Sequence, residues 1–313
     1  MKKTLSMLLA GAMLATALTG CGGSASSSSD SQNSGSDSTA SGTAFKIGGT
    51  GPLTGANAIY GNACKNGAQI AVDEINAEGG DIQFELNYQD DESDAEKAVN
   101  AYNTLKDWGM QLSLGSVTSK PCEATAAENY SDRIFALTPS ASSVAVTEGK
   151  DNVFQMCFMD PNQGTASAQY IAEQKLGTKV AIIWKNDDVY STGIHDKFVE
   201  EAKAKSLQVV SDKTFTDASA NDFSVQLNEA KSKPKFFGVD GMDGILTMEG
   251  FDPKLAEGVM LLTPFNADAT DDKTASFVKK YKEQFGETPN QFAADAYDCV
   301  YAYKQALENA GAT

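Results

Sequence analysis

The sequence predicts an α/β fold with parallel sheets arranged in two lobes. The first observation behind this prediction is that short apolar strands alternate with amphipathic helices from Phe45 onward. The second is that this alternation fills two halves of similar size, each long enough for a lobe of its own. Two lobes of this kind leave a cleft between them, which is a preferred site for a small ligand.

The first half, residues 45–157, begins with a strand that contains Phe45 and Ile47. A loop rich in glycine and threonine follows, which delivers Tyr60 and then enters a helix whose apolar residues begin at Ala63. Hydrophobic periodicity and turn residues predict the other elements. These are strands at 82–88, 110–114 and 134–138, and helices at 63–78, 95–105 and around Pro121.

Three exit loops of these strands, around Thr54, Ser116 and Ser140, are rich in Gly, Ser and Thr. Ligands of parallel α/β sheets bind just beyond the carboxyl ends of the strands. One such loop would be unremarkable, because Ser and Gly are ordinary turn residues. Three at equivalent places predict a polar binding site, and a turn or cap function stays open for each serine.

The second half, residues 158–265, repeats the alternation. Its exit loop at 185–193 carries Asp187, Asp188 and Tyr190, and a short strand ends at Asp240. The expected elements are helices at 162–175, 193–205 and 223–230 and strands at 180–184, 207–213, 236–239 and 258–263. Two final helices, at 271–285 and 289–309, form a segment 266–313 that we expect to return to the first lobe.

Residues 1–20 combine two lysines, a short apolar run and small residues, which is typical of an export signal. The run Leu-Thr-Gly-Cys at its end is similar to the lipobox of bacterial lipoproteins, in which the cysteine is acylated. Two acyl chains anchor a protein stably. We therefore expect Cys21 to be lipidated at the extracytoplasmic face of a cell membrane; an ordinary signal peptide with a stray cysteine is the alternative. The Ser- and Gly-rich residues 21–44 are expected to be a flexible tether.

The chain carries 42 acidic and 25 basic residues, a net charge of −17. The first 20 residues hold two of the lysines and no acid, so the mature chain has a net charge of −19. A surface this acidic repels nucleic acid and anionic lipid headgroups. Nucleic acid is therefore not an expected partner.

The other cysteines are even in number, which allows two disulfides with three possible pairings. Free thiols are the open alternative, because cysteine also packs as a small hydrophobe. With no CxxC pair and a single histidine, His195, we expect no zinc site, and we expect His195 to be a solvated surface residue. The four cysteines are Cys64, Cys122, Cys157 and Cys299.

Four motifs together resemble a known family: the lipobox, the loop GPLTG…IYG…NG, EINAEGG and YQDDESD. Their combination is similar to the branched-chain amino-acid-binding lipoproteins of ABC importers, with the type I periplasmic binding fold, over about residues 45–309. The resemblance implies two Rossmann-like lobes joined by a hinge, which trap an amino acid and deliver it to an ABC permease. A monomer is expected. A sensor, or an importer component for another small polar solute such as an amide, urea or a nucleoside, is the alternative.

The same resemblance implies a binding site of three hydroxyls, two aromatic walls and one acid. The hydroxyls would bind the ligand's carboxylate, and the acid would face its ammonium group through charge-assisted hydrogen bonds. The tyrosines would supply apolar walls with polar tips. Matched position by position, the hydroxyls are Ser116, Ser140 and Ser142, the walls are Tyr60 and Tyr190, and the acid is Asp240.

Two departures from the family indicate a shortened fold. Family members have a further strand and helix where Lys231-Ser232-Lys233-Pro234 here connects directly to the next strand. Loss of such a βα unit would expose a sheet edge or bring non-adjacent strands together. The chain also stops at Thr313, where the family has more strands. We therefore expect a version that lacks one βα unit and the C-terminal strands.

An enzyme is the alternative from a different class. Gly49-Thr50-Gly51 loosely resembles a dinucleotide fingerprint, but GxGxxG is absent, and Asp90 and Asp91 lie roughly twice too far along the chain. A Ser-His-Asp triad would have to use His195. We therefore expect neither enzymatic activity nor a cofactor.

Overall fold

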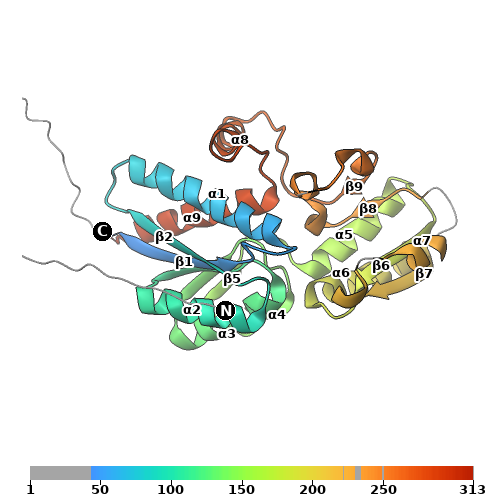
Figure 1. Cartoon of the computed structure of the whole chain (residues 1–313), viewed down its shortest axis with the longest axis horizontal. Coiled ribbons are helices and arrows are strands. Elements are labelled where there is room, and N and C mark those ends of the chain that lie inside the picture. Colours follow the sequence, from blue (N-terminus) through green and yellow to red (C-terminus); the bar gives the residue numbers. More distant parts are fainter. Residues whose placement is uncertain (1–43, 221, 230–233, 249, 313) are drawn as a thin grey trace, which may run out of the picture. The chain divides into compact units, whose positions relative to one another are not determined.

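The computed structural model describes residues 44–220, 222–229, 234–248 and 250–312 (Figure 1). These residues belong to one compact unit of the chain. The expected lipidation site Cys21, the signal peptide and most of the tether lie outside them, as do residues 231–233 of the expected short connection. No helix within the described ranges is long and apolar enough to cross a membrane.

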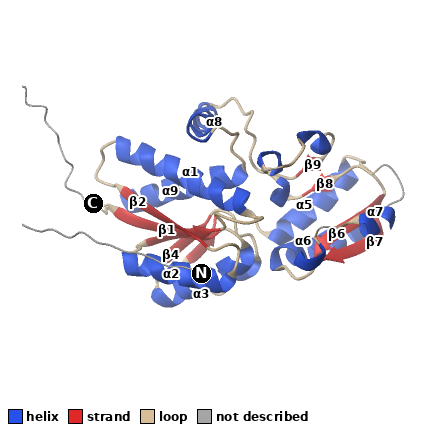
Figure 2. Ribbon diagram, in the orientation of Figure 1, coloured by secondary structure: helices blue, strands red, loops and turns tan. Residues whose placement is uncertain are grey.

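Five parallel strands form the largest sheet of the described residues (Figure 2). Their order is β2-β1-β3-β4-β5. Phe45 in β1 pairs with Phe84 in β2, and Ile47 pairs with Leu112 in β3. β1 is buried from Ile47 to Gly51, as expected for a strand of a parallel sheet covered on both faces. The strands are β1 (Phe45–Gly51), β2 (Phe84–Asp90), β3 (Leu112–Ser116), β4 (Phe135–Thr138) and β5 (Val153–Gln155).

Helices cover both faces of this sheet. α1 and α9 pack together on one face, whereas α2 and α3 lie side by side on the other (Figure 1). The main apolar core joins Ile47 of the sheet, Ile70 of α1, Phe277 of α8 and Val300 of α9. The helices are α1 (Ala58–Ala77), α2 (Ala95–Trp108), α3 (Ser119–Asp132), α4 (Val144–Thr147), α8 (Asp272–Phe285) and α9 (Gln291–Asn309).

α1 and α9 approach each other closely at Gly67. A Cβ atom at this position would lie 1.9 Å from the carbonyl oxygen of Ala293 in α9, a backbone atom that cannot move aside. Only glycine therefore permits this approach.

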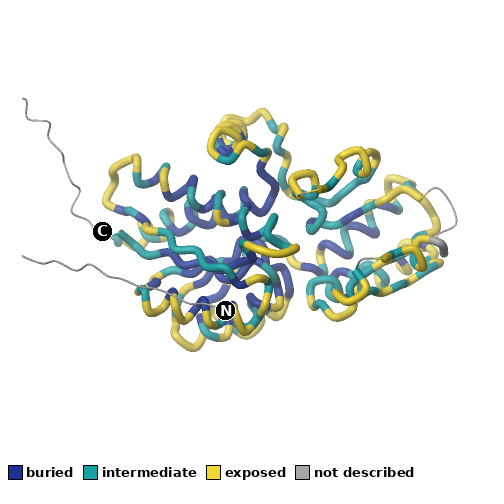
Figure 3. The backbone as a smooth tube through the Cα atoms, in the orientation of Figure 1, coloured by how far each residue is buried: buried dark blue, intermediate teal, exposed yellow. Residues whose placement is uncertain are grey.

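Two smaller parallel sheets, β6-β7 and β8-β9, follow in the second half. α5 and α6 pack on each other and enclose a small core of Ala168, Ile171, Ala202 and Leu207. Burial is sparser here than in the five-stranded sheet (Figure 3). The elements are α5 (Asp160–Glu173), β6 (Lys179–Lys185), α6 (Val189–Ala204), β7 (Gln208–Phe215), α7 (Ser224–Glu229), β8 (Phe237–Gly238) and β9 (Met260–Leu261), with 3₁₀ turns η1 (Asp217–Ser219), η2 (Asp240–Met242), η3 (Ile245–Thr247) and η4 (Pro253–Ala256).

The region of the expected deletion runs from α7 to β8. Within the described residues of this stretch, 222–229 and 234–238, no strand or helix lies between these two elements. β7 and β8 do not pair, and each belongs to its own two-stranded sheet among the described strands.

Three predicted helix starts near strand ends were wrong. α1 begins at Ala58, so Tyr60 lies in its first turn and not in a loop. α6 begins at Val189, because the Asp188 carboxylate accepts a hydrogen bond from Ser191 N and caps the helix; Tyr190 therefore lies on the helix. α5 begins at Asp160 with a proline in its first turn, and not after a cap at position 162.

The four cysteines of the described chain are free thiols. Burial raises the pKa of Cys122 to about 11 and raises the pKa of Cys64 and Cys299 as well. Because the thiolate is the reactive form, these cysteines act as buried apolar residues.

Candidate functional site

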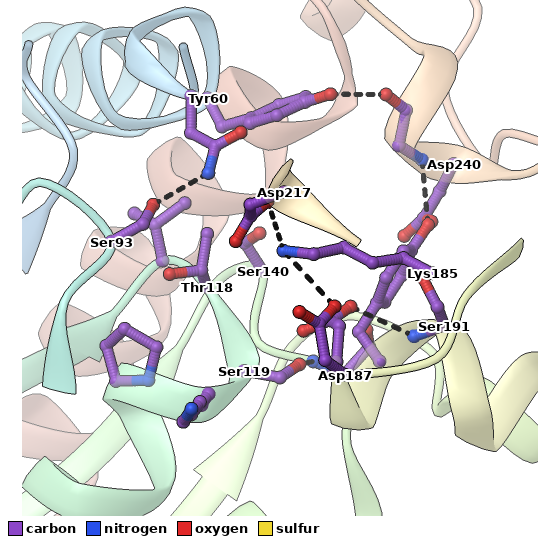
Figure 4. Close-up of a pocket in the computed structure, with 18 of the residues that line it drawn as sticks. Tyr60, Ser93, Thr118, Ser119, Ser140, Lys185, Asp187, Ser191, Asp217 and Asp240 are labelled. Atoms are coloured by element: carbon purple, nitrogen blue, oxygen red, sulfur yellow. Dashed lines mark hydrogen bonds and ion pairs between the residues drawn. The ribbon is translucent and has the colours of Figure 1, made fainter. Parts of the chain in front are cut away.

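A pocket of about 530 Å³ lies at the carboxyl ends of the strands (Figure 4). This volume lies within the roughly 300–1,000 Å³ that small-ligand sites occupy. Nearly every segment that lines it follows the end of a strand, and the start of α9 adds one aromatic ring. The lining residues are Asn57, Tyr60, Ser93, Asp94, 117–121, Ser140, Ser142, Lys185, Asp187, Asp188, Tyr190, Ser191, Phe215, Asp217, Asp240, Gly241 and Phe292.

The structure brings five of the six predicted binding residues to this pocket. They come from four segments far apart in the sequence, and each segment follows the carboxyl end of a parallel strand: β1, β4, β6 or β8. The five are Tyr60, Ser140, Ser142, Tyr190 and Asp240.

Ser116 is the exception, because it does not line the pocket. Its side chain is fully buried, and its hydroxyl lies 2.6 Å from Thr50 Oγ1 and 3.0 Å from Thr125 Oγ1. Thr50 in turn donates to the Asp91 carboxylate at 3.1 Å. A glycine at 115 in the left-handed region (φ 61°) precedes Ser116 and turns the chain there. The Ser116 hydroxyl, which was expected to bind the ligand, therefore forms a hydrogen bond between β3 and β1 instead.

The hydroxyl-bearing residues Thr118 and Ser119, at the start of α3, line the pocket where Ser116 was expected. Ser119, the first residue of α3, accepts hydrogen bonds through its hydroxyl from Ser142 N and Ser143 N, both at 3.2 Å. This pair of bonds ties the loop after β4 to the start of α3. Thr118 Oγ1 is buried at the pocket without a hydrogen bond to any residue that the structure describes. An unpaired buried hydroxyl next to a helix N-terminus suits an anionic group.

Two tyrosines and an acid form the opposite corner of the pocket. Tyr190 donates its hydroxyl to Asp240 Oδ1 at 2.5 Å and accepts from Gly241 N at 3.1 Å. Tyr60 donates to the carbonyl oxygen of Gly241 at 2.5 Å. Asp240 N donates to Gln163 Oε1 at 2.6 Å, and the residue is only 2% exposed. Burial raises the pKa of Asp240 and raises that of Tyr60 to about 12.

Sequence reasoning missed Asp160, the first residue of α5. The residue is 1% exposed, and burial together with the negative charges of Asp240 and Asp188 raises the pKa of its carboxyl to about 8. The Ser142 hydroxyl beside it partly opposes this shift, although neither carboxylate oxygen makes a hydrogen bond of normal geometry to a residue that the structure describes. An Asp before a proline at a helix start looks like an ordinary cap in the sequence, so no signal distinguished it.

Sequence reasoning also missed an ion group in the pocket, which we call the Lys185 triad. Lys185 Nζ lies 2.7 Å from Asp217 Oδ1 and 4.0 Å from Asp187 Oδ1. Figure 4 shows its side chain reaching across the pocket toward these two carboxylates. The Lys185 side chain is 26% exposed, whereas that of Asp217 is 83% exposed. The sequence shows Asp187 in an exit loop, but it does not indicate that Asp217, which follows β7, pairs with Lys185.

His195 is not the solvated surface residue that the sequence suggested. Its ring stacks on Trp184 with 3.9 Å between centroids, and its side chain is 12% exposed. Nε2 lies 2.9 Å from Asp212 Oδ2 and Nδ1 lies 3.0 Å from Asp196 Oδ1, so both nitrogens face carboxylates and not a serine hydroxyl. In the described part of the chain, no cluster of three or more His, Cys, Asp or Glu side chains could hold a metal ion.

A family model described as periplasmic binding protein matches residues 44–247 and 235–313. The chain belongs to this family. Members of this family are non-enzymatic, substrate-binding components of transport systems.

Two similar proteins are named for the amino acids that they bind. The Leu/Ile/Val-binding protein BraC3 of Rhizobium johnstonii is 33% identical over 193 residues, which are 60% of this chain and span about half (51%) of that relative. The Leu/Ile/Val-binding protein homolog 1 of Brucella abortus is 27% identical over 296 residues, covering 83% of this chain and 77% of the relative.

Solved structures confirm the predicted fold class. The substrate-binding protein LivJ of the Streptococcus pneumoniae branched-chain amino acid transporter, in complex with isoleucine, superposes with a TM-score of 0.75 at 26% identity over 85% of this chain and 84% of that one. A solute-binding protein from Rhodopseudomonas palustris in complex with 3,4-dihydroxybenzoic acid gives 0.73 at 18% identity, over 86% and 82%. The type I periplasmic binding fold is therefore confirmed, and it is a fold with more than one ligand class.

Proposed function

We propose that this protein is the extracytoplasmic solute-binding component of an ABC importer and that it captures an α-amino acid in the pocket described above. The hydroxyl-bearing residues Thr118, Ser119 and Ser140 lie on one side of the pocket, and Asp240 lies on the other (Figure 4). A zwitterion has the complementary pattern, with a carboxylate at one end of its backbone and an ammonium group at the other. This arrangement is the observation that carries the proposal.

The proposed mechanism is closure of two lobes, 45–157 and 158–265, about a hinge, with segment 266–313 belonging to the first lobe. Hinge closure around a ligand requires that the ligand bind the closed state better than the open one. The ligand is then delivered to a membrane permease without covalent chemistry.

Branched-chain amino acids are the first ligands to test, because similar proteins carry their names. The alternative is a sensor, or an importer component for another small polar solute such as an amide, urea or a nucleoside. A panel of solutes separates these ligand classes.

We also propose that Cys21 is acylated and holds the protein, as a monomer, at the extracytoplasmic face of the cell membrane. The support for this proposal is the lipobox-like run before Cys21 and the signal-like residues 1–20.

Asp240→Asn tests the proposed function. Asparagine keeps an oxygen acceptor for the Tyr190 hydroxyl but removes the charge that would face the ligand's ammonium group. A hydrogen bond to a charged group contributes about 1.5–3 kcal/mol, so we expect amino-acid binding to weaken at least about tenfold. The measurement is isothermal titration calorimetry of the full-length protein with L-leucine, L-isoleucine, L-valine and polar amino acids.

The matched control is Asp151→Asn. Asp151 forms an exposed ion pair with Arg133 at 2.6 Å and does not line the pocket, so binding should be unchanged. The proposal fails if no α-amino acid binds the wild-type protein, or if Asp240→Asn binds every amino acid as tightly as wild type.

A further inference from the structure

The Lys185 triad places charge where an aliphatic side chain would need an apolar wall. Asp187 and Lys185 come from the end of β6 and Asp217 from the turn after β7, and all three line the pocket. Among the residues that the structure describes, the ammonium group of Lys185 pairs with carboxylates alone, at 2.7 and 4.0 Å. The side chains of both acids are accessible to water, since Asp187 is 46% and Asp217 is 83% exposed.

Filling the pocket removes water from these three groups. A ligand with an aliphatic side chain would strip hydration from the triad and supply no hydrogen bond in return. Taking charges out of water costs free energy unless new hydrogen bonds satisfy them. A ligand side chain that ends in a polar group can replace the lost water.

The sign of the charge in the pocket selects a donor group on the ligand. Among its described lining residues, five are acidic and two are basic. Asp94 and Asp188 already accept hydrogen bonds from backbone N–H groups at helix starts, and Asp240 faces Tyr190. Asp187 and Asp217 remain, two carboxylates that share one ammonium group.

This inference rests on the proposed function and deepens it. We propose that the Lys185 triad sets the specificity of the pocket for an α-amino acid whose side chain ends in a hydrogen-bond donor, an ammonium, guanidinium or amide group. The backbone of the ligand lies against the hydroxyls and Asp240, and its side-chain donor is accepted by Asp187 and Asp217. Aliphatic amino acids bind more weakly, because their side chains desolvate the triad without pairing it.

The test is calorimetric titration of the full-length protein with L-leucine, L-glutamine, L-lysine, L-arginine and L-glutamate. We expect at least one of the three donor-bearing ligands to bind about tenfold or more tightly than L-leucine. L-Leucine binding as tightly as all three donors overturns the inference and leaves the proposed function standing. If L-glutamate binds most tightly of the five, the inference is overturned in the same way, because Lys185 would then be the group that binds the ligand's side chain. Binding of none of the five overturns the inference, and it overturns the proposed function as well if no other α-amino acid binds.

Asp217→Asn separates specificity from general binding. Asp217 is 83% exposed, so the substitution leaves the fold intact and removes one acceptor charge. We expect about five-fold weaker binding of the preferred donor ligand, near the upper end of what an exposed ion pair contributes, and less than two-fold change for L-leucine. Asp151→Asn, which breaks an exposed pair of similar length, should change neither. Equal losses for both ligands, or no loss for either, overturn the assignment.

Discussion

Asp160 makes stability depend on pH in a direction opposite to that of an ordinary paired carboxylate. Its carboxyl is 1% exposed and faces the negative charges of Asp240, Asp188 and Glu123, and burial is the largest cause of its raised pKa. In the unfolded chain the same group has an ordinary pKa near 3.8. We predict that Asp160→Asn stabilises the protein, because asparagine has the shape of the protonated acid and no charge to bury.

The size of the effect follows from linkage. Well below pH 3.8 the acid is protonated in both states and contributes no difference. As the pH rises, the unfolded chain loses the proton first, while the folded chain keeps it until about pH 8. Stability therefore falls across this window. At about 1.4 kcal/mol for each pH unit, the loss that Asp160 causes between pH 5 and pH 8 is on the order of 4 kcal/mol.

The assay is urea-induced unfolding of wild type and Asp160→Asn at pH 5, 6, 7 and 8, followed by circular dichroism. The advantage of the variant should grow with pH and level off near pH 8. Asp151→Asn serves as the control, because its exposed carboxylate should give a small effect that does not grow across this range. An advantage of Asp160→Asn that is equal at pH 5 and pH 8, or a variant less stable at pH 8, would refute the argument.

Two further predictions concern other parts of the chain. Gly67→Ala should destabilise the protein by about 1–3 kcal/mol in urea unfolding, because its Cβ would lie 1.9 Å from Ala293 O. The control is Gly80→Ala, where a Cβ meets nothing within 4 Å. Equal stabilities of the two variants would contradict the close contact between α1 and α9. Cys21→Ser should move the protein from the membrane fraction to the soluble fraction and abolish incorporation of labelled palmitate; continued labelling of the variant would exclude Cys21 as the acylated residue.

The sequence predicted the parts of the site that depend on topology. Ser140 and Ser142 follow β4 and Asp240 follows β8, and ligands of parallel sheets bind just beyond the carboxyl ends of the strands whatever the side chains between them. Tyr60 and Tyr190 were placed in loops but lie in first helical turns, and they still line the pocket.

The parts that depend on side-chain direction could not be predicted. The Ser116 side chain points toward Thr50 and not into the pocket. Its direction depends on an irregular register between β1 and β3 and on the positive φ of Gly115. Neither is visible in a pattern of residue types. The ion pair of Lys185 with Asp217 joins the ends of β6 and β7. It can be predicted only once the pairing of these two strands is known.

The small core beneath β6 and β7 links binding to local folding. Only a few apolar side chains, among them Ile171 and Leu207, are buried there, and Val210 in β7 is 52% exposed. Segments with sparse burial open at a lower free energy than the rest of a domain. Asp187 follows β6 and Asp217 follows β7, so a ligand whose donor these carboxylates accept also stabilises the folded form of this segment. The measured affinity therefore includes the free energy of ordering β6 and β7, and slower amide hydrogen exchange in these strands would accompany each bound ligand.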